Sequence, residues 1–106
     1  MKSLTNRRVY RTIVFSKWFS KQDFKTQMRI NARLQRIEID GHFGTINVFN
    51  GLVELKWSSG LRIYMFLMEQ KIIVILLGGN KRGQDKDIKK AKNLKKQIEE
   101  DGFDET

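Results

Sequence analysis

The sequence predicts an α+β domain in which a mostly antiparallel sheet carries its helices on one face. Asn50-Gly51 is a strong signal for a tight hairpin, and Ser58-Ser59-Gly60 fits a three-residue hairpin loop. The segments beside both turns alternate between polar and apolar residues, as half-buried strands do. Apolar residues at helical spacing precede this region, and a charged helical segment follows it. The expected order is therefore strand, two helices, four strands and a final helix.

The N-terminal part of the chain is expected to form one strand and two helices. Val9–Phe15 is rich in residues that favour strands, and Ser16 could cap the helix that follows. Apolar residues then recur at helical spacing through Lys17–Glu38. Asp23 is a residue type that begins helices, so it predicts a break that divides this segment into two helices.

Four strands are predicted after this helical region. They lie at about Thr45–Phe49, Leu52–Trp57, Leu61–Met68 and Lys71–Leu77. The last of them is apolar on both faces, which predicts an inner strand covered on both sides. Gly78-Gly79 is expected to break this strand, and a basic helix is predicted from about Gln84 to Glu100.

The two hairpins together predict which side chains share a face of the sheet. Pairing across the second hairpin loop puts Lys56 opposite Arg62. It also puts Glu54 opposite Tyr64, so all four side chains point to one side. The register set by the first hairpin agrees, and the other side of the sheet is apolar. The polar side is either the ordinary wet face of a half-buried sheet or a functional site.

Composition limits the classes of function. The 106 residues suit one domain, and no apolar run approaches the ~20 residues that span a bilayer. The chain has no cysteine and one histidine, so we expect no disulfide, no metal and no cofactor. The N-terminus lacks the apolar core of a signal peptide, and we therefore expect a cytoplasmic protein without membrane association.

Positive charge is concentrated in two regions of the chain. Lys and Arg number 21 against 12 Asp and Glu, which gives a net charge of +9. This imbalance favours a polyanionic partner, with nucleic acid ahead of an acidic protein or a membrane surface. The candidate RNA-binding residues are Lys25, Arg29, Arg33 and Arg36 on the predicted helix, and Arg82 and Lys86 after the last strand. For the helical group, a solvated helix face is the alternative interpretation.

Three short strings stand out in the second half of the chain. They are Glu54-Leu55-Lys56, Gly60-Leu61-Arg62-Ile63-Tyr64, and Leu76-Leu77-Gly78-Gly79-Asn80-Lys81 continuing to Gln84, Asp87 and Ile88. In this order and spacing they resemble the RelE/ParE toxin superfamily, in particular its HigB-like addiction module killer branch. The resemblance covers roughly Val9 to Ile98. The chain departs from the family where Leu61 replaces a tyrosine, where Ile88 stands at the place of a RelE tyrosine, and where only Lys56 matches a pair of lysines.

The resemblance implies a RelE-like, microbial-RNase-like fold and the toxin of a type II toxin–antitoxin pair. Many members of the superfamily are metal-independent endoribonucleases that cut mRNA in the ribosomal A site, and others poison gyrase. The resemblance also implies a cognate antitoxin, encoded beside the toxin and carrying a helix-turn-helix. Arg62 matches the arginine that contacts the scissile phosphate in RNA-cleaving relatives, and Lys81 and Arg82 match the basic pair after the last strand.

The chemistry of RNA cleavage by the 2′-OH suggests a role for each candidate. The reaction needs a proton acceptor, cations on the phosphorane and a donor for the leaving oxygen. Arg62 can hold a phosphate through two hydrogen bonds, and Lys56 or Lys81 could act as base or acid. Tyr64 could donate a proton or stack on a base, and its alternative is packing at the edge of the core. Glu54 is either a base or an ion-pair partner that orients Lys56 or Arg62.

Three functions remain open on the sequence. The first is a ribosome-dependent mRNA endoribonuclease, which a sheet face of Lys, Arg, Glu and Tyr favours. The second is a gyrase poison of the ParE type, which shares the fold. The third is a basic module that binds RNA without cutting it.

Overall fold

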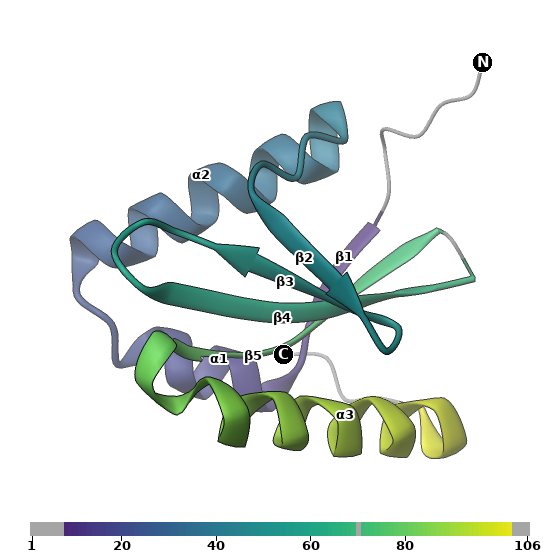
Figure 1. Ribbon diagram of the computed structural model, residues 1–106. Helices are drawn as coiled ribbons and strands as arrows, with labels where there is room; N and C mark the ends of the chain where they lie inside the picture. The colour runs from purple at the N-terminus through teal and green to yellow at the C-terminus, as the bar shows by residue number, and fades with distance from the viewer. Residues whose placement is uncertain (1–7, 70, 103–106) are drawn as a thin grey trace.

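The computed structural model describes residues 8–69 and 71–102 and confirms the α+β fold with the predicted order of elements (Figure 1). In chain order the elements are β1 (Arg8–Arg11), α1 (Ile13–Ser20), α2 (Phe24–Asp40), β2 (Ile46–Phe49), β3 (Leu52–Lys56), β4 (Leu61–Met68), β5 (Ile72–Asn80), the short 3-10 helix η1 (Lys81–Gly83) and α3 (Gln84–Asp101). Within these described ranges, no helix is both long and apolar enough to cross a membrane.

The five strands form one sheet in the order β1-β5-β4-β3-β2. β1 runs parallel to β5, and the other neighbouring pairs are antiparallel. Lys56 pairs with Arg62 and Glu54 pairs with Tyr64, which confirms the predicted register of the central hairpin. The first hairpin turn has Asn50 at φ 50° and Gly51 at φ 76°, the left-handed conformation that an Asn-Gly turn requires.

The first helix begins earlier than its sequence suggests. The predicted strand Val9–Phe15 with a cap at Ser16 is wrong, because the strand ends at Arg11 and α1 starts at Ile13. Thr12 caps α1 by accepting a hydrogen bond from the N–H of Phe15 at 3.0 Å. Its hydroxyl also donates to the carbonyl of Leu76 on β5 at 2.7 Å, so a contact distant in sequence fixes the helix start.

The break between the first two helices is confirmed. α2 begins after Asp23, whose Oδ1 accepts a hydrogen bond from the N–H of Thr26 at 2.8 Å. α2 ends at Gly41, which has φ 73° and caps the helix in the left-handed conformation.

The helices cover both faces of the sheet, so the expectation of helices on one face is wrong. Figure 1 shows α2 and α3 on opposite sides of the strands. On the α2 side, Ile30 and Leu34 pack in a core with Leu55 and other strand residues. On the α3 side, Ala91 and Ile98 pack in a second core. The strand residues of this second core include Leu52, Tyr64, Phe66, Val74 and Leu76. The face that carries Glu54 and Arg62 is therefore polar over part of its length and apolar over the rest.

β5 is an inner strand buried on both faces, as predicted, but it does not stop at the two glycines. The strand continues through Gly78 and Gly79 to Asn80. A Cβ atom at Gly78 would overlap the ring of Trp18, and one at Gly79 would overlap the carboxylate of Asp87. Gly78 therefore leaves room for Trp18 of α1, and Gly79 leaves room for Asp87 of α3. Close approach of another group is a common reason for glycine inside a strand.

Candidate nucleic-acid interface

The loop between β3 and β4 brings together segments that are distant in sequence. The N–H of Gly60 donates to the carbonyl of Trp57 at 3.0 Å, and Gly60 takes φ 102°. The carbonyl of Gly60 in turn accepts a hydrogen bond from the N–H of Lys81 at 2.8 Å. The β3–β4 loop is thereby fixed beside η1, and the predicted basic pair Lys81 and Arg82 lies next to it.

Three adjoining hollows surround this loop. One lies against Lys81 and Arg82, one runs between the loop and Arg36 of α2, and one connects them past Asn80. Ser59 lines all three hollows, and Arg29 lines two of them. We call this continuous surface the loop track and define it by Arg29, Arg36, Trp57, Ser59, Asn80, Lys81 and Arg82. It is open to solvent and long enough to pass from η1 to α2.

Four cations of the loop track are exposed. They are Arg29, Arg36, Lys81 and Arg82. In the part of the chain that the structure describes, the ion pairs are Arg62–Glu54 and Lys95–Glu99, and neither involves these four side chains. The positive charge along the loop track is therefore available to an anion, and a concave, basic surface raises the local concentration of polyanions.

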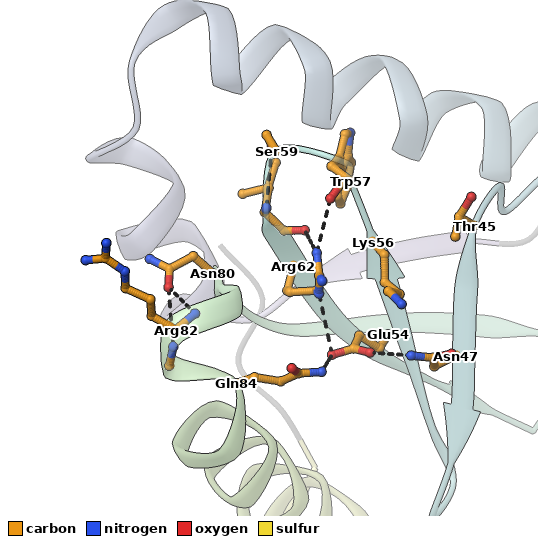
Figure 2. Close-up of polar contacts among 12 residues, drawn as sticks. Thr45, Asn47, Glu54, Lys56, Trp57, Ser59, Arg62, Asn80, Arg82 and Gln84 are labelled. Atoms are coloured by element: carbon orange, nitrogen blue, oxygen red, sulfur yellow. Dashed lines mark hydrogen bonds and ion pairs between the residues drawn. The ribbon is translucent and has the colours of Figure 1, made fainter.

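Beside the track lies a buried polar cluster (Figure 2). Glu54 is 0% exposed. Its carboxylate accepts hydrogen bonds from the side-chain amides of Asn47 at 2.9 Å and Gln84 at 2.8 Å. Arg62 Nε lies 4.0 Å from the same carboxylate. Because Gln84 is the first residue of α3, Glu54 links the start of that helix to the central hairpin.

Arg62 is almost enclosed by its own hairpin. Its side chain donates from Nη1 to the carbonyls of Trp57 at 3.2 Å and Leu61 at 3.0 Å, and the residue is 7% exposed. Lys56, its partner across the hairpin, is half-buried, and Figure 2 shows both side chains on the same side as Glu54. The structure therefore brings Glu54, Lys56 and Arg62 together as predicted, but beneath the start of α3.

Tyr64 lies inside the fold, away from solvent. It is 0% exposed, and its hydroxyl makes no hydrogen bond within the described residues. Burial, with a contribution from the neighbouring Glu54 carboxylate, raises the pKa of Tyr64 above its ordinary value. Neither Tyr64 nor Glu54 is open to RNA in this structure. The contacts of Glu54 match the second interpretation, that of an ion-pair partner that orients Arg62.

The basic residues of α2 divide into two groups. Lys25, Arg29 and Arg36 are exposed, whereas Arg33 is half-buried. The guanidinium of Arg33 donates to the carbonyls of Phe43 at 2.9 and 2.8 Å, Thr45 at 2.6 Å and Lys56. It also lies 4.3 Å from the centroid of the Trp57 ring. Burial lowers the pKa of Arg33. Arg33 therefore fixes the segment before β2, and its guanidinium N–H groups are engaged by carbonyl oxygens.

Two further predicted RNA contacts lie apart from the loop track. Lys25 and Lys86 are exposed on α2 and α3, and neither lines the three hollows described above. Both remain available to a partner that extends beyond the track.

Sequence reasoning missed Ser59, Asn80 and Gln84. Asn80 accepts hydrogen bonds from the N–H groups of Arg82 at 2.9 Å and Gly83 at 3.3 Å and thereby caps η1. An Asn that follows an apolar run and two glycines is a detectable cap signal. Gln84 has no comparable signal, because its contact with Glu54 depends on how α3 lies on the sheet. Trp57 packs against the core and also lines the track.

Comparison with known proteins adds a family. Residues 17–97 match the family described as Phage derived protein Gp49-like (DUF891). An uncharacterized protein of Haemophilus influenzae is 37% identical over 91 residues, which cover 82% of this chain and 91% of that protein.

Solved structures of bacterial toxins share the fold. An arginine-to-alanine double mutant of the E. coli toxin RelE, solved in the free state, matches with a TM-score of 0.68 at 12% identity, over 84% of this chain and 98% of that one. The intact E. coli RelBE toxin-antitoxin complex matches with a TM-score of 0.58 at 13% identity, over 70% and 95%. The isolated E. coli RelE toxin gives 0.55 at 13% identity, over 78% and 96%. The chain therefore belongs to the Gp49-like family of phage-derived proteins, and its fold is that of the RelE toxins.

Proposed function

We propose that this protein is the toxin of a type II toxin–antitoxin pair and that it cleaves translated mRNA on the ribosome without a metal. The observation that carries the proposal is the loop track, an open surface with four exposed cations that form no ion pair in the described part of the chain. The RelE fold and the HigB-like strings around Arg62 and Lys81 support it. We assign the chain to the HigB-like branch as part of the same proposal.

The exposed cations suggest how the track would act on the scissile phosphate. Lys81 and Arg82 stand on η1, where they can contact the phosphate and stabilise the negative charge of the phosphorane. Arg62 lies behind them on β4, held by two carbonyls and the Glu54 carboxylate. Arg62 can meet a phosphate only if the loop moves and its contacts with the carbonyls of Trp57 and Leu61 are exchanged for the phosphate. We therefore place Arg62 as a third cation that RNA reaches when the loop adjusts.

The reaction is a transfer at phosphorus by the neighbouring ribose. The 2′-oxygen bonds to phosphorus as its proton leaves, and the bond to the 5′-oxygen breaks as that oxygen takes up a proton. The products are a 2′,3′-cyclic phosphate and a 5′-hydroxyl. Lys56 and Lys81 are the candidates for the two proton transfers, one accepting the proton of the 2′-OH as a neutral amine and the other donating a proton to the 5′-oxygen as an ammonium. We leave Tyr64 and Glu54 out of the proton transfers because both are fully buried.

A basic surface of this size also predicts its partner. The antitoxin would carry acidic residues and cover part of the loop track, which would keep the toxin inactive while the two are bound. The proposed setting is the cytoplasm, where translated mRNA and ribosomes are present.

The test is induction of the toxin in cells, followed by primer extension on a translated message and on the same message without its start codon. The wild type should cut the translated message alone. Lys81→Ala/Arg82→Ala should reduce cutting by about 10²-fold or more, because each cation contacts the phosphorane. The matched control is Lys89→Ala/Lys92→Ala, which removes two exposed lysines from α3. It should cut like the wild type.

Two results would contradict the proposal. Toxicity with relaxed or broken DNA and with intact mRNA would indicate gyrase as the target. RNA that co-purifies with the protein but shows no cut ends would indicate a module that binds without cleavage.

A further inference from the structure

The loop track continues well beyond the cations that would hold the cleaved phosphate. From Lys81 and Arg82 it passes Asn80 and Ser59 and reaches the groove between α2 and the β3–β4 loop. A single phosphate needs only the first part. A surface of this extent fits a strand that bends around the loop and places its next nucleotide in the groove.

The groove beside α2 offers the two kinds of contact that a nucleotide makes. Arg29 and Arg36 are exposed at its rim and can bind a phosphate. Trp57 contributes an aromatic surface, and the Arg33 guanidinium holds its ring at a centroid distance of 4.3 Å. Single-stranded RNA is bound by this combination, in which bases stack on aromatic or guanidinium planes and cations follow the backbone.

The ring of Trp57 is fixed before any ligand arrives. Arg33 joins it to carbonyls of residues before β2 and at the end of β3, and the ring also packs against the core under α2. A base that contacts a fixed ring does not have to order it, which favours binding. Ser58 and Ser59 line the groove on the same side as Trp57, and α2 forms its other side.

We infer that the groove between α2 and the β3–β4 loop is a subsite for a nucleotide that flanks the cleaved phosphate, with its base against Trp57 and its phosphate on Arg29 and Arg36. This inference rests on the proposed function, because it identifies the strand that crosses the track as the RNA substrate. It adds a contact with a base to a site that otherwise recognises only phosphates.

The test uses the fluorescence of Trp57 in a Trp18→Phe background, which leaves one tryptophan. The probes are a six-nucleotide 2′-O-methyl RNA, which cannot be cleaved by its 2′-oxygen, and a strand of the same length without bases. The RNA should change the Trp57 fluorescence, and the abasic strand should leave it unchanged and bind about tenfold more weakly. As a check that does not need the Trp18 substitution, a 4-thiouridine strand should photo-crosslink to Trp57 in the wild-type protein.

Charge variants test the phosphate contacts. Arg29→Gln/Arg36→Gln should reduce the dependence of log K on log salt by about 1.4, that is, about 0.7 for each lost contact with a single strand. The control is Lys89→Gln/Lys92→Gln, which removes two exposed lysines of α3 that do not line the groove. Its affinity should stay within about twofold of the wild type.

The outcomes separate this inference from the proposed function if cleavage of translated mRNA is measured in parallel. Cleavage without any fluorescence change or crosslink at Trp57 overturns the subsite alone. Equal losses of affinity in the two charge variants also overturn it. Absence of both cleavage and RNA binding overturns the proposed function and the subsite with it.

Discussion

Glu54 and Arg62 form a buried ion pair whose remaining polar atoms are mostly satisfied. Two amides donate to the carboxylate, and Arg62 Nη1 donates to two carbonyls. Arg62 Nε has no hydrogen bond among the described residues and lies 4.0 Å from Glu54 Oε2. Removing one charge from such a pair leaves the other buried and uncompensated, which costs more than the pair itself contributes. The pair therefore holds Arg62 in position, and it makes the stability of the hairpin depend on Glu54.

Glu54→Ala should lower the free energy of unfolding by about 3 kcal/mol, because Arg62 would remain buried without its partner. Urea denaturation followed by circular dichroism measures this change. The control is Glu99→Ala, which breaks the exposed Lys95–Glu99 pair of 2.9 Å and should cost less than about 1 kcal/mol. A Glu54→Ala protein as stable as the Glu99→Ala protein would contradict the role given to the buried pair.

β5 shows how a strand depends on the helices that pack against it. β5 could be predicted as a doubly covered strand because Ile72 to Leu77 are all apolar. Its extension through Gly78 and Gly79 could not be predicted, because these glycines are needed to make room for Trp18 and Asp87, which lie elsewhere in the sequence. The same applies to Thr12, whose role as a cap depends on the carbonyl of Leu76. Local turn chemistry is written in the sequence, whereas these contacts exist only after the elements pack.

Gly78→Ala should destabilise the protein by about 1–3 kcal/mol, because the added methyl group would overlap the Trp18 ring in a packed layer. Gly83→Ala is the matched substitution. Its methyl group would lie 3.4 Å from Asp87 Oδ2, an ordinary contact, and Gly83 has φ −95°. Thermal denaturation of both variants decides the point. A Gly78→Ala protein with the melting temperature of Gly83→Ala would show that the strand tolerates a side chain there.

Asp87 on α3 should make the free energy of unfolding depend on pH. Burial raises the pKa of Asp87, and Lys90 and Lys86 reduce that effect. The folded protein therefore keeps this proton to higher pH than the unfolded chain does. Stability from this group is present below the ordinary carboxyl pKa of ~3.9 and is lost as pH rises through the raised value. Asp87→Asn should remove this loss, so its advantage over the wild type should grow across that window and then level off.

Urea denaturation at a series of pH values measures the Asp87 effect. Asp85→Asn is the control, because it removes another acidic side chain from the first turn of α3 at an exposed position. A constant difference between Asp87→Asn and the wild type at all pH values would contradict the assignment.

The whole molecule places a positive surface at one end of a sheet that is covered on both faces. The sequence predicted the order of elements, both hairpins and the register that gathers Glu54, Lys56 and Arg62, because turn residues and period-two alternation are local signals. It did not predict that α3 covers this polar face. The apolar residues Leu52 and Phe66, which lie on the same face beyond the polar residues, were a signal that a helix covers this face. We therefore propose that RNA first binds the exposed cations of the loop track, rather than the sheet face itself.

The most direct measurement is cleavage by purified protein on ribosomes that carry a defined mRNA. The wild type should produce a 2′,3′-cyclic phosphate end, and an mRNA with 2′-deoxyribose at the cut position should stay intact. The single-turnover rate should fall by about 10²-fold or more in Lys81→Ala/Arg82→Ala and stay unchanged in Lys89→Ala/Lys92→Ala. Intact wild-type mRNA, or equal rates in the two double variants, would contradict the account that the loop track cleaves RNA.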